Sequence, residues 1–232
     1  MTLLSRLFRR APVLDVPPEF NRNSATVTAL MPPEDAGRLL LEKMRTRIGF
    51  ESYADKSLLD FGCGVRFSQA ILNTKMPFGR YTGVDNFAPM IELLQRNVRD
   101  PRFRYHFLDA YHPLYNVAGN RLSATTTLPF DDGEFDVVAM FSVITHQYPA
   151  DAEAIFTMLR RYASPRGHLF FTCFLDDTIE EFEDRSPEKN GGRCHYNARY
   201  LTSIVERCRW RVQNIAPAEG PLIADSFLCT PA

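Results

Sequence analysis

The feature that most constrains the fold is residues 57–67, SLLDFGCGVRF. The first half is apolar and short enough for a buried strand, and apolar residues resume at helical spacing from residue 68. Gly62 and Gly64 stand between these two parts. Glycine lets the backbone turn sharply and approach a ligand closely. The stretch therefore predicts a strand, a glycine turn and a helix, which would place a nucleotide-like ligand at the carboxyl end of a parallel sheet.

Two residues around this turn limit the ligand. The dinucleotide-binding fingerprint requires a third glycine where Phe67 stands, so a pyrophosphate group is disfavoured. Asp60 precedes the first glycine by two residues. Its carboxylate would repel a phosphate, but it suits a cation or an amine that donates hydrogen bonds.

Two further predicted strands also end in carboxylates. Residues 80–85 end at Asp85, and residues 103–110 end next to Asp109. The first of these acids lies about 20 residues beyond the glycine turn, where a ribose presents hydroxyls that a carboxylate can bind. Because the carboxyl ends of parallel strands share one edge, both acids and Asp60 are expected on one rim. The alternative is that each acid only caps a helix or a turn.

These motifs resemble those of the class I S-adenosylmethionine-dependent methyltransferases, over roughly residues 34–230. DFGCG at 60–64 is similar to motif I of that family, D/E-x-G-x-G-x-G, with Arg66 in place of the last glycine. GVD at 83–85 is similar to motif II, and LPFDDGEFDVV at 128–138 is similar to the segment that leads into the fourth strand. SVITH at 142–146 resembles a group of small-molecule methyltransferases.

The resemblance implies an α/β protein with the Rossmann-like class I methyltransferase fold. That fold has a seven-stranded, mostly parallel sheet with an antiparallel last strand and helices on both faces. Residues 1–33 would form an N-terminal arm and residues 34–232 the methyltransferase domain. The implied cofactor is S-adenosylmethionine, with S-adenosylhomocysteine as product. The cofactor-binding residues carried over from the motifs are Asp60, Gly62, Gly64, Asp85, Asn86, Asp109, Ala110, Phe141 and Ser142.

Within this set, the resemblance assigns the ribose to Asp85, and the adenine to Asp109 and the backbone amide of Ala110. Phe141 and Ser142, together with His146, would border the sulfonium and methyl groups.

Methyl transfer requires the methyl group and the acceptor lone pair to be held near contact distance, with water excluded. A hydroxyl acceptor must also lose its proton, and His146, after the fourth predicted strand, is the leading candidate for the base. Its alternative role is only to shape the pocket. Candidates for contact with the acceptor are His112, Tyr115, His195 and Tyr196. The sequence shows no metal-ligand spacing, so a metal-assisted mechanism is a lesser option.

Composition narrows the partners and the compartment. Lys and Arg total 27 and Asp and Glu total 28, a formal net charge of −1, which argues against nucleic acid as the main partner. Five cysteines without a C-x-x-C pair argue against a zinc site or a disulfide framework and favour the cytoplasm. The balanced charge and the aromatic residues Tyr111 and Tyr115 favour a small-molecule acceptor, with a hydroxyl of a sugar, a glycolipid or a secondary metabolite preferred. A protein acceptor is the alternative.

Two other functions stay open at this point. One is a non-catalytic partner protein with the methyltransferase fold. The other is an NAD-dependent oxidoreductase, which would require the missing third glycine and would leave Asp60 and Asp109 unexplained.

Three segments outside the motifs carry weaker predictions. Residues 1–10 are either a frayed end or a short amphipathic segment that makes weak contact with a membrane surface. Residues 111–127 form a long connection that either borders the substrate or is inert elaboration. Residues 176–193 are predicted to be an acidic loop.

Overall fold

The computed structural model describes residues 14–21, 31–112, 115–131, 133–186, 193–219 and 224–232. The strands are β1 (Tyr53–Phe61), β2 (Phe78–Asp85), β3 (Phe103–Phe107), β4 (Phe135–Met140), β5 (Ala163–Leu175), β6 (Phe182–Asp184), β7 (Cys194–Tyr196), β8 (Trp210–Ala216) and β9 (Asp225–Pro231). The helices are α2 (Pro33–Ile48), α3 (Arg66–Asn73), α4 (Ala88–Asn97), α5 (Pro149–Arg160) and α6 (Ala198–Arg207), with short 3₁₀ turns η2 (Pro18–Phe20) and η3 (Ile144–His146).

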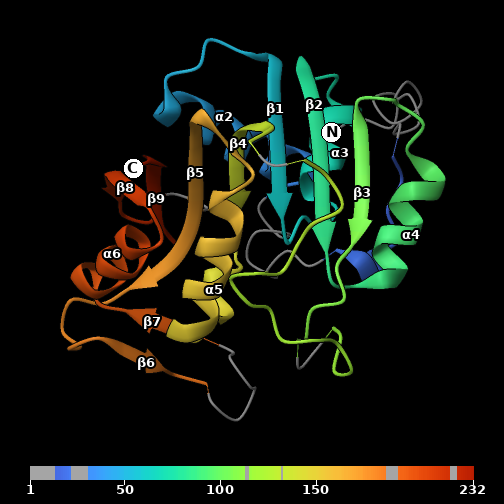
Figure 1. The fold of residues 1–232 in the computed structure, drawn as a ribbon. Coiled ribbons are helices and arrows are strands. Elements are labelled where there is room, and N and C mark those ends of the chain that lie inside the picture. The colour runs from blue at the N-terminus through green and yellow to red at the C-terminus, as the bar shows by residue number, and fades with distance from the viewer. Residues whose placement is uncertain (1–13, 22–30, 113–114, 132, 187–192, 220–223) are drawn as a thin grey trace.

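The strands of the described ranges form one sheet with a parallel centre (Figure 1). Strands β3, β2, β1, β4 and β5 lie side by side in that order, and every pairing among them is parallel. Strand β9 pairs with β5 in the antiparallel sense, and β8 pairs antiparallel with β9. These seven strands confirm the predicted mostly parallel sheet with an antiparallel last strand.

A small hairpin of β6 and β7 extends the sheet. The prediction of a loop over residues 176–193 is therefore wrong for β6, which lies inside this range, and β7 begins directly after it. Strand β7 continues from the carboxyl end of β5 through the parallel pairs Phe174↔His195 and Leu175↔Tyr196. Strand β6 pairs antiparallel with β7. Each of the two strands has three residues, too few for an alternating pattern to be visible in the sequence.

Each face of the sheet carries its own hydrophobic core, because neighbouring strand residues point to opposite faces. Leu59 packs into the core that is covered by α5 and α6, and Leu58 packs into the core that is covered by α2, α3 and α4. Figure 1 shows these helices on the two sides of the sheet. This confirms the expected layers and leaves the carboxyl ends of the strands free to form a site.

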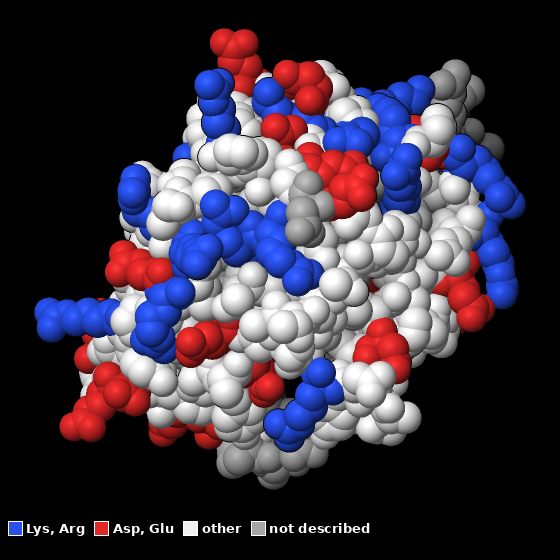
Figure 2. All heavy atoms as spheres, viewed as in Figure 1, with Lys and Arg blue, Asp and Glu red and all other residues white. Residues whose placement is uncertain are grey.

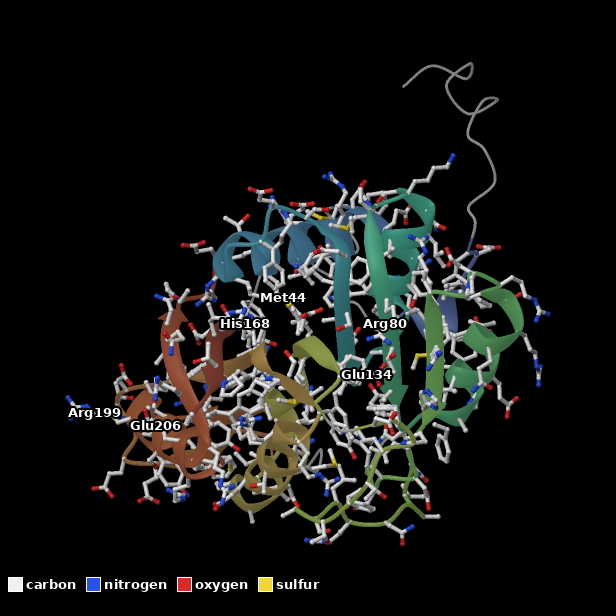
Figure 3. The ribbon with its side chains drawn as sticks, turned by 45° about the horizontal axis from the view of Figure 1, so that its top comes forward. Met44, Arg80, Glu134, His168, Arg199 and Glu206 are labelled. Carbon is white, nitrogen blue, oxygen red and sulfur yellow. The ribbon has the colours of Figure 1, made fainter. Side chains whose placement is uncertain are left out.

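The opposite end of the sheet, where the strands begin, is closed by polar contacts. Arg80 of β2 and Glu134, which precedes β4, form an ion pair at 2.6 Å, and Figure 3 labels both side chains.

Charged side chains of both signs are spread over the face shown in Figure 2. This distribution agrees with the nearly balanced composition.

Part of the predicted N-terminal arm is docked on the domain. The backbone N–H of Leu14 donates to Asn73 Oδ1 at 2.8 Å, and Asn73 Nδ2 donates to the Leu14 carbonyl at 3.1 Å. Leu14 is buried, and Phe20 contacts Phe87 with ring centroids 6.0 Å apart. The predicted membrane-surface contact of residues 1–10 falls outside the described residues. Over the described ranges, every helix is too short or too polar to cross a membrane.

The core beneath α5 generates the first prediction. The buried Phe171 ring packs between Phe156 and Phe227, with centroid distances of 4.9 and 4.8 Å. We expect Phe171→Ala to lower the free energy of unfolding by about 3–5 kcal/mol, because it leaves a cavity in a close-packed core. Urea unfolding followed by the fluorescence of Trp210, the only tryptophan of the chain, measures this loss.

Val117→Ala is the matched control, since Val117 is 71% exposed and its truncation should change stability by less than about 0.5 kcal/mol. Equal stability of the two variants would contradict the described packing.

Candidate functional site

The turn after β1 is fixed by hydrogen bonds to the neighbouring strand. The N–H groups of Gly62 and Cys63 both donate to the Val84 carbonyl, at 2.8 and 3.1 Å. Gly62 has a φ of +76°, and a Cβ added there would lie 2.5 Å from Val143 Cγ2. Gly64 has a φ of +52° and open space where a Cβ would stand. Glycine is therefore required at both positions, once for packing and once for backbone conformation.

A cavity of about 240 Å³ lies at this turn, at the carboxyl ends of β1, β2 and β4. Most of the residues predicted from the sequence line it. These are Asp60, Gly62, Gly64, Asp85, Asn86, Ala110, His112, Tyr115, Phe141, Ser142 and His146. The structure therefore brings together residues from the ends of β1, β2 and β4 and from the long connection after β3.

Asp85 is held in a fixed orientation at the end of β2. Its Oδ2 accepts from the N–H of Gly64 and its Oδ1 from the N–H of Phe87, both at 3.0 Å. The side chain is 3% exposed and lines the cavity. A carboxylate in the cavity wall can accept hydrogen bonds from ligand donors such as the hydroxyls of a diol.

Asp60 is a buried acid beside the turn. It is 2% exposed, and its Oδ2 accepts from the hydroxyl of Tyr81 at 2.6 Å. Burial raises the pKa of Asp60 to about 8, and the charge of Asp85 adds to the rise, while the Tyr81 bond and the charge of Arg66 oppose it. A cationic ligand would favour the ionised carboxylate.

The wall of the cavity after β4 is built on aromatic packing. Phe141 stacks on Phe170 at 5.5 Å and meets Phe67 edge-on at 4.9 Å. Ser142 has a φ of +57°, a strained conformation for a residue with a side chain, and its N–H donates to Thr172 Oγ1 at 2.8 Å. Strain of this kind is concentrated at functional sites.

His146 belongs to a group of rings at the outer part of the cavity. The His112 ring lies 6.5 Å from the His146 ring, nearly perpendicular to it, and stacks on Tyr115 at 4.6 Å. Tyr115 and Tyr111 are partly exposed. The connection at residues 111–127 thus supplies part of the cavity wall, which favours a role in binding over inert elaboration.

Asp109 does not line the described cavity, unlike the other two predicted acids. Strand β3 ends at Phe107, two residues earlier than the acid, so the predicted strand over residues 103–110 is too long. The exposed carboxylate of Asp109 accepts from Asn116 Nδ2 at 2.9 Å and from Asn120 Nδ2 at 2.7 Å. Its position was predicted by assuming that β3 ends at the acid, as β2 does. In the structure, Asp109 holds the following connection in place.

His195 and Tyr196 also lie outside the cavity wall. Both belong to β7, where His195 stacks on Phe174 at 5.2 Å. Tyr196 is buried, and its hydroxyl donates to the carbonyl of Gln147 at 2.6 Å. Gln147 lines the cavity, so Tyr196 supports the wall from behind. The sequence shows no sign of strand β7, which holds both of these candidate residues at the edge of the sheet.

Several residues that line the cavity were not predicted from the sequence. Phe20 and Asn21 come from the docked arm, which has no motif that would place it at the site. Arg66 and Gln69 of α3 also line the cavity. The replacement of the last motif I glycine by Arg66 was the one sequence feature that could have placed these two residues at the cavity.

The described residues contain no group of three His, Cys, Asp or Glu side chains that could hold a metal ion.

Comparison with known proteins identifies the central part of the chain. Residues 59–171 match the family model described as a methyltransferase domain. This segment is a class I methyltransferase domain. The matched segment begins in β1 and ends in β5, so it contains the glycine turn, Asp85 and His146.

Solved structures of methyltransferases share this fold at low identity. The geranyl diphosphate C-methyltransferase from Streptomyces coelicolor is 14% identical, with a TM-score of 0.59 over 86% of this chain and 79% of that one. The 1,6-didemethyltoxoflavin N1-methyltransferase from Burkholderia thailandensis, solved with S-adenosylhomocysteine, is also 14% identical, with a TM-score of 0.57 over 86% and 78%. A Haloferax volcanii protein solved with the Trm112 methyltransferase activator is 11% identical, with a TM-score of 0.55 over 76% and 82%.

The cavity of this methyltransferase fits the cofactor that the sequence predicts. The open space at Gly64 leaves room for a ligand against bare backbone, and the Asp85 carboxylate lies on the same cavity wall. Asp60 supplies an acid for an amino group, and Gln69 Oε1 is a buried acceptor without a hydrogen-bond partner in the described part of the chain. Adenosine hydroxyls and an α-amino group are therefore compatible with the residues present.

The raised pKa of Asp60 generates the second prediction. In the unfolded chain this carboxyl ionises near its ordinary pKa of 3.8, whereas in the folded protein it ionises at about 8. Between these values the folded state binds more protons, so the stability contributed by Asp60 falls as the pH rises from about 4 to 8. Asp60→Asn removes this loss. The free energy of unfolding of Asp60→Asn should therefore increase relative to that of the wild type between pH 5 and pH 8, by at most about 4 kcal/mol.

Chemical unfolding at several pH values measures the difference. Asp131→Asn, at an exposed position, is the control and should run parallel to the wild type. Parallel curves for Asp60→Asn as well would show that Asp60 is ionised throughout this range in the folded protein.

Proposed function

We propose that this methyltransferase binds S-adenosylmethionine in the cavity at the glycine turn and transfers its methyl group to a hydroxyl of a small molecule. The observation that carries the proposal is the geometry of Asp85. Two backbone N–H groups hold the carboxylate beside a glycine turn whose Gly64 has open space next to it.

The cofactor supplies a methyl group that is activated by the positive sulfur atom. Asp85 would accept hydrogen bonds from the ribose hydroxyls. Asn86 Nδ2 donates to the carbonyl of Ala110 at 3.2 Å, and this bond joins the end of β2 to the connection after β3, where the two would form one wall for the adenine. Phe141 and Ser142 would border the methyl group, where a close-packed wall would keep water away from the reacting atoms.

His146 would take the proton from the acceptor hydroxyl as its oxygen bonds to the methyl carbon. The carbon–sulfur bond would break in the same step, with S-adenosylhomocysteine as the leaving group. The position of His146 at the end of η3, after β4, places it on the cavity wall. The adjacent His112 ring faces it across 6.5 Å. Orientation of the two reactants supplies most of the rate, and a positioned base adds about 10²–10⁴-fold.

The lining residues favour an uncharged acceptor. Among the described lining residues, the charged ones are Asp60, Arg66 and Asp85, and all three lie around the glycine turn. The outer part is lined by aromatic, amide and aliphatic side chains, such as Tyr111, Leu122 and Gln147. This combination suits a sugar, a glycolipid or a secondary metabolite that carries a hydroxyl. The substrates named for two structural neighbours, 1,6-didemethyltoxoflavin and geranyl diphosphate, support a small molecule as the acceptor.

The third prediction tests the cofactor. Calorimetric titration should show micromolar binding of S-adenosylmethionine and S-adenosylhomocysteine, and none of NADH. Asp85→Ala should weaken the binding of both sulfur ligands at least tenfold, because two hydrogen bonds to a charged acceptor are lost. Asp55→Ala, an exposed acid at the other end of β1, should bind like the wild type.

Failure of the wild type to bind either sulfur ligand would contradict the proposal and favour a non-catalytic role. Binding of NADH in their place would favour the oxidoreductase.

The fourth prediction tests the base. His146→Asn should keep the affinity for S-adenosylhomocysteine within about twofold, since this ligand lacks the methyl group that His146 would border and the asparagine amide fills part of the same space. Its turnover of an acceptor hydroxyl found by screening should fall about 10²–10⁴-fold. Release of S-adenosylhomocysteine measures the turnover. Unchanged turnover would restrict His146 to shaping the pocket.

A further inference from the structure

A second hollow, with a volume of about 490 Å³, lies where α5 and α6 end. Because α5 ends just before β5 begins, this hollow is at the opposite end of the sheet from the cavity at the glycine turn. The two share no lining residue within the described ranges. Small side chains line the hollow together with four arginines, Arg160, Arg161, Arg207 and Arg209. Figure 2 shows Lys and Arg side chains gathered near the middle of that face, in the area that α5 occupies in Figure 1.

Three of the four arginines have no acidic partner in the described part of the chain. Arg207 pairs with Glu153 at 3.1 Å. Over the described ranges, Arg160, Arg161 and Arg209 form no ion pair. Burial lowers the pKa of Arg160, and the charge of Arg209 lowers it further. Neighbouring cations that repel each other in this way are stabilised by an anion between them.

The guanidinium of Arg161 is only partly satisfied by the protein. Its Nη2 donates to the Thr126 carbonyl at 2.7 Å and to the Tyr162 hydroxyl at 2.9 Å. Its Nε is buried and has no hydrogen-bond partner among the described residues. A buried donor on a cation is costly to leave unpaired, so this side chain is incomplete without a further acceptor.

Helix stability explains only part of this cluster. The C-terminus of a helix carries partial negative charge and favours cations, and both α5 and α6 end here. Arg160 Nε accordingly donates to the Arg209 carbonyl, just beyond the end of α6, at 3.0 Å. Arg209 itself is exposed and has a φ of +63°, a conformation that suits glycine better. The helix end therefore does not account for an arginine at this position.

The chemistry of the hollow fits a ligand with two linked phosphate groups. A guanidinium presents a fork of N–H donors that matches the oxygens of a phosphate. Arginines from two helix ends line one hollow, which favours an anion long enough to reach both over a single phosphate. Among the described lining residues none is aromatic, so the hollow has no stacking surface for a nucleobase.

We propose that this arginine hollow binds a diphosphate group, either as inorganic pyrophosphate or as part of a small molecule. The inference does not depend on the proposed function, because the hollow is separate from the cavity at the glycine turn.

Calorimetric titration with inorganic pyrophosphate, in the absence of divalent cations, tests the proposal. The wild type should bind pyrophosphate at least about tenfold more tightly than sulfate, which reaches fewer of the arginines. Arg209→Met and Arg160→Met should each weaken pyrophosphate binding about tenfold, since a charge-assisted contact is lost. Arg209→Lys should recover part of the affinity, because it keeps the charge but not the fork.

Arg199→Met is the matched control, because this exposed residue, labelled in Figure 3, lies near the other end of α6. It should bind pyrophosphate like the wild type. The urea midpoint of Arg209→Met should also equal that of the wild type, which demonstrates that the weakened variant is folded.

UDP in place of pyrophosphate identifies the source of the diphosphate. Equal affinities support a site for the diphosphate of a larger molecule, and binding of pyrophosphate alone supports a site for the inorganic ion. Equal affinities for pyrophosphate and sulfate, or pyrophosphate binding that neither Met variant weakens, would overturn the proposal. Binding of an oligoglutamate peptide without any binding of pyrophosphate would also overturn it, and would make the hollow a docking surface for an acidic protein segment.

Discussion

The site depends on one set of hydrogen bonds, those that tie the turn after β1 to the end of β2. The Val84 carbonyl accepts from two consecutive N–H groups of the turn, and Asp85 accepts from a third. This arrangement forces the chain through two left-handed positions, which only glycine occupies without strain. It also aims the first turn of α3 at the cavity. The cavity floor, the orientation of Asp85 and the position of Arg66 all follow from these bonds.

The sequence predicted the sheet and much of the site because both depend on local signals. Apolar strand segments that end in glycine or an acid identify β1 and β2, and the family motifs place β4 and η3 in the correct order. The antiparallel last strand came from the resemblance, because no local pattern separates β9 from the other strands. The prediction for Asp109 was wrong because it assumed that β3, like β2, ends at its acid. β3 ends two residues before Asp109, and the acid is therefore taken up by the amides of Asn116 and Asn120.

Contacts between distant segments could not be predicted from local patterns. Phe20 reaches the cavity because Leu14 and Asn73, 59 residues apart, exchange two hydrogen bonds. The short strand β7 is stabilised by pairing with the end of β5, and its own three residues carry no strand signal. Tyr196 consequently acts on the cavity indirectly, through the carbonyl of Gln147. In each case the deciding partner lies far away in the sequence.

The docked arm has a consequence for how ligand binding and folding are coupled. Phe20 lines the cavity, yet the described part of the arm is joined to the domain mainly by the Leu14–Asn73 pair of bonds and by apolar contacts. A ligand that touches Phe20 therefore binds most tightly to the molecule with its arm in place. Thermodynamic reciprocity then requires that such a ligand hold the arm down by the same factor by which the docked arm raises its affinity.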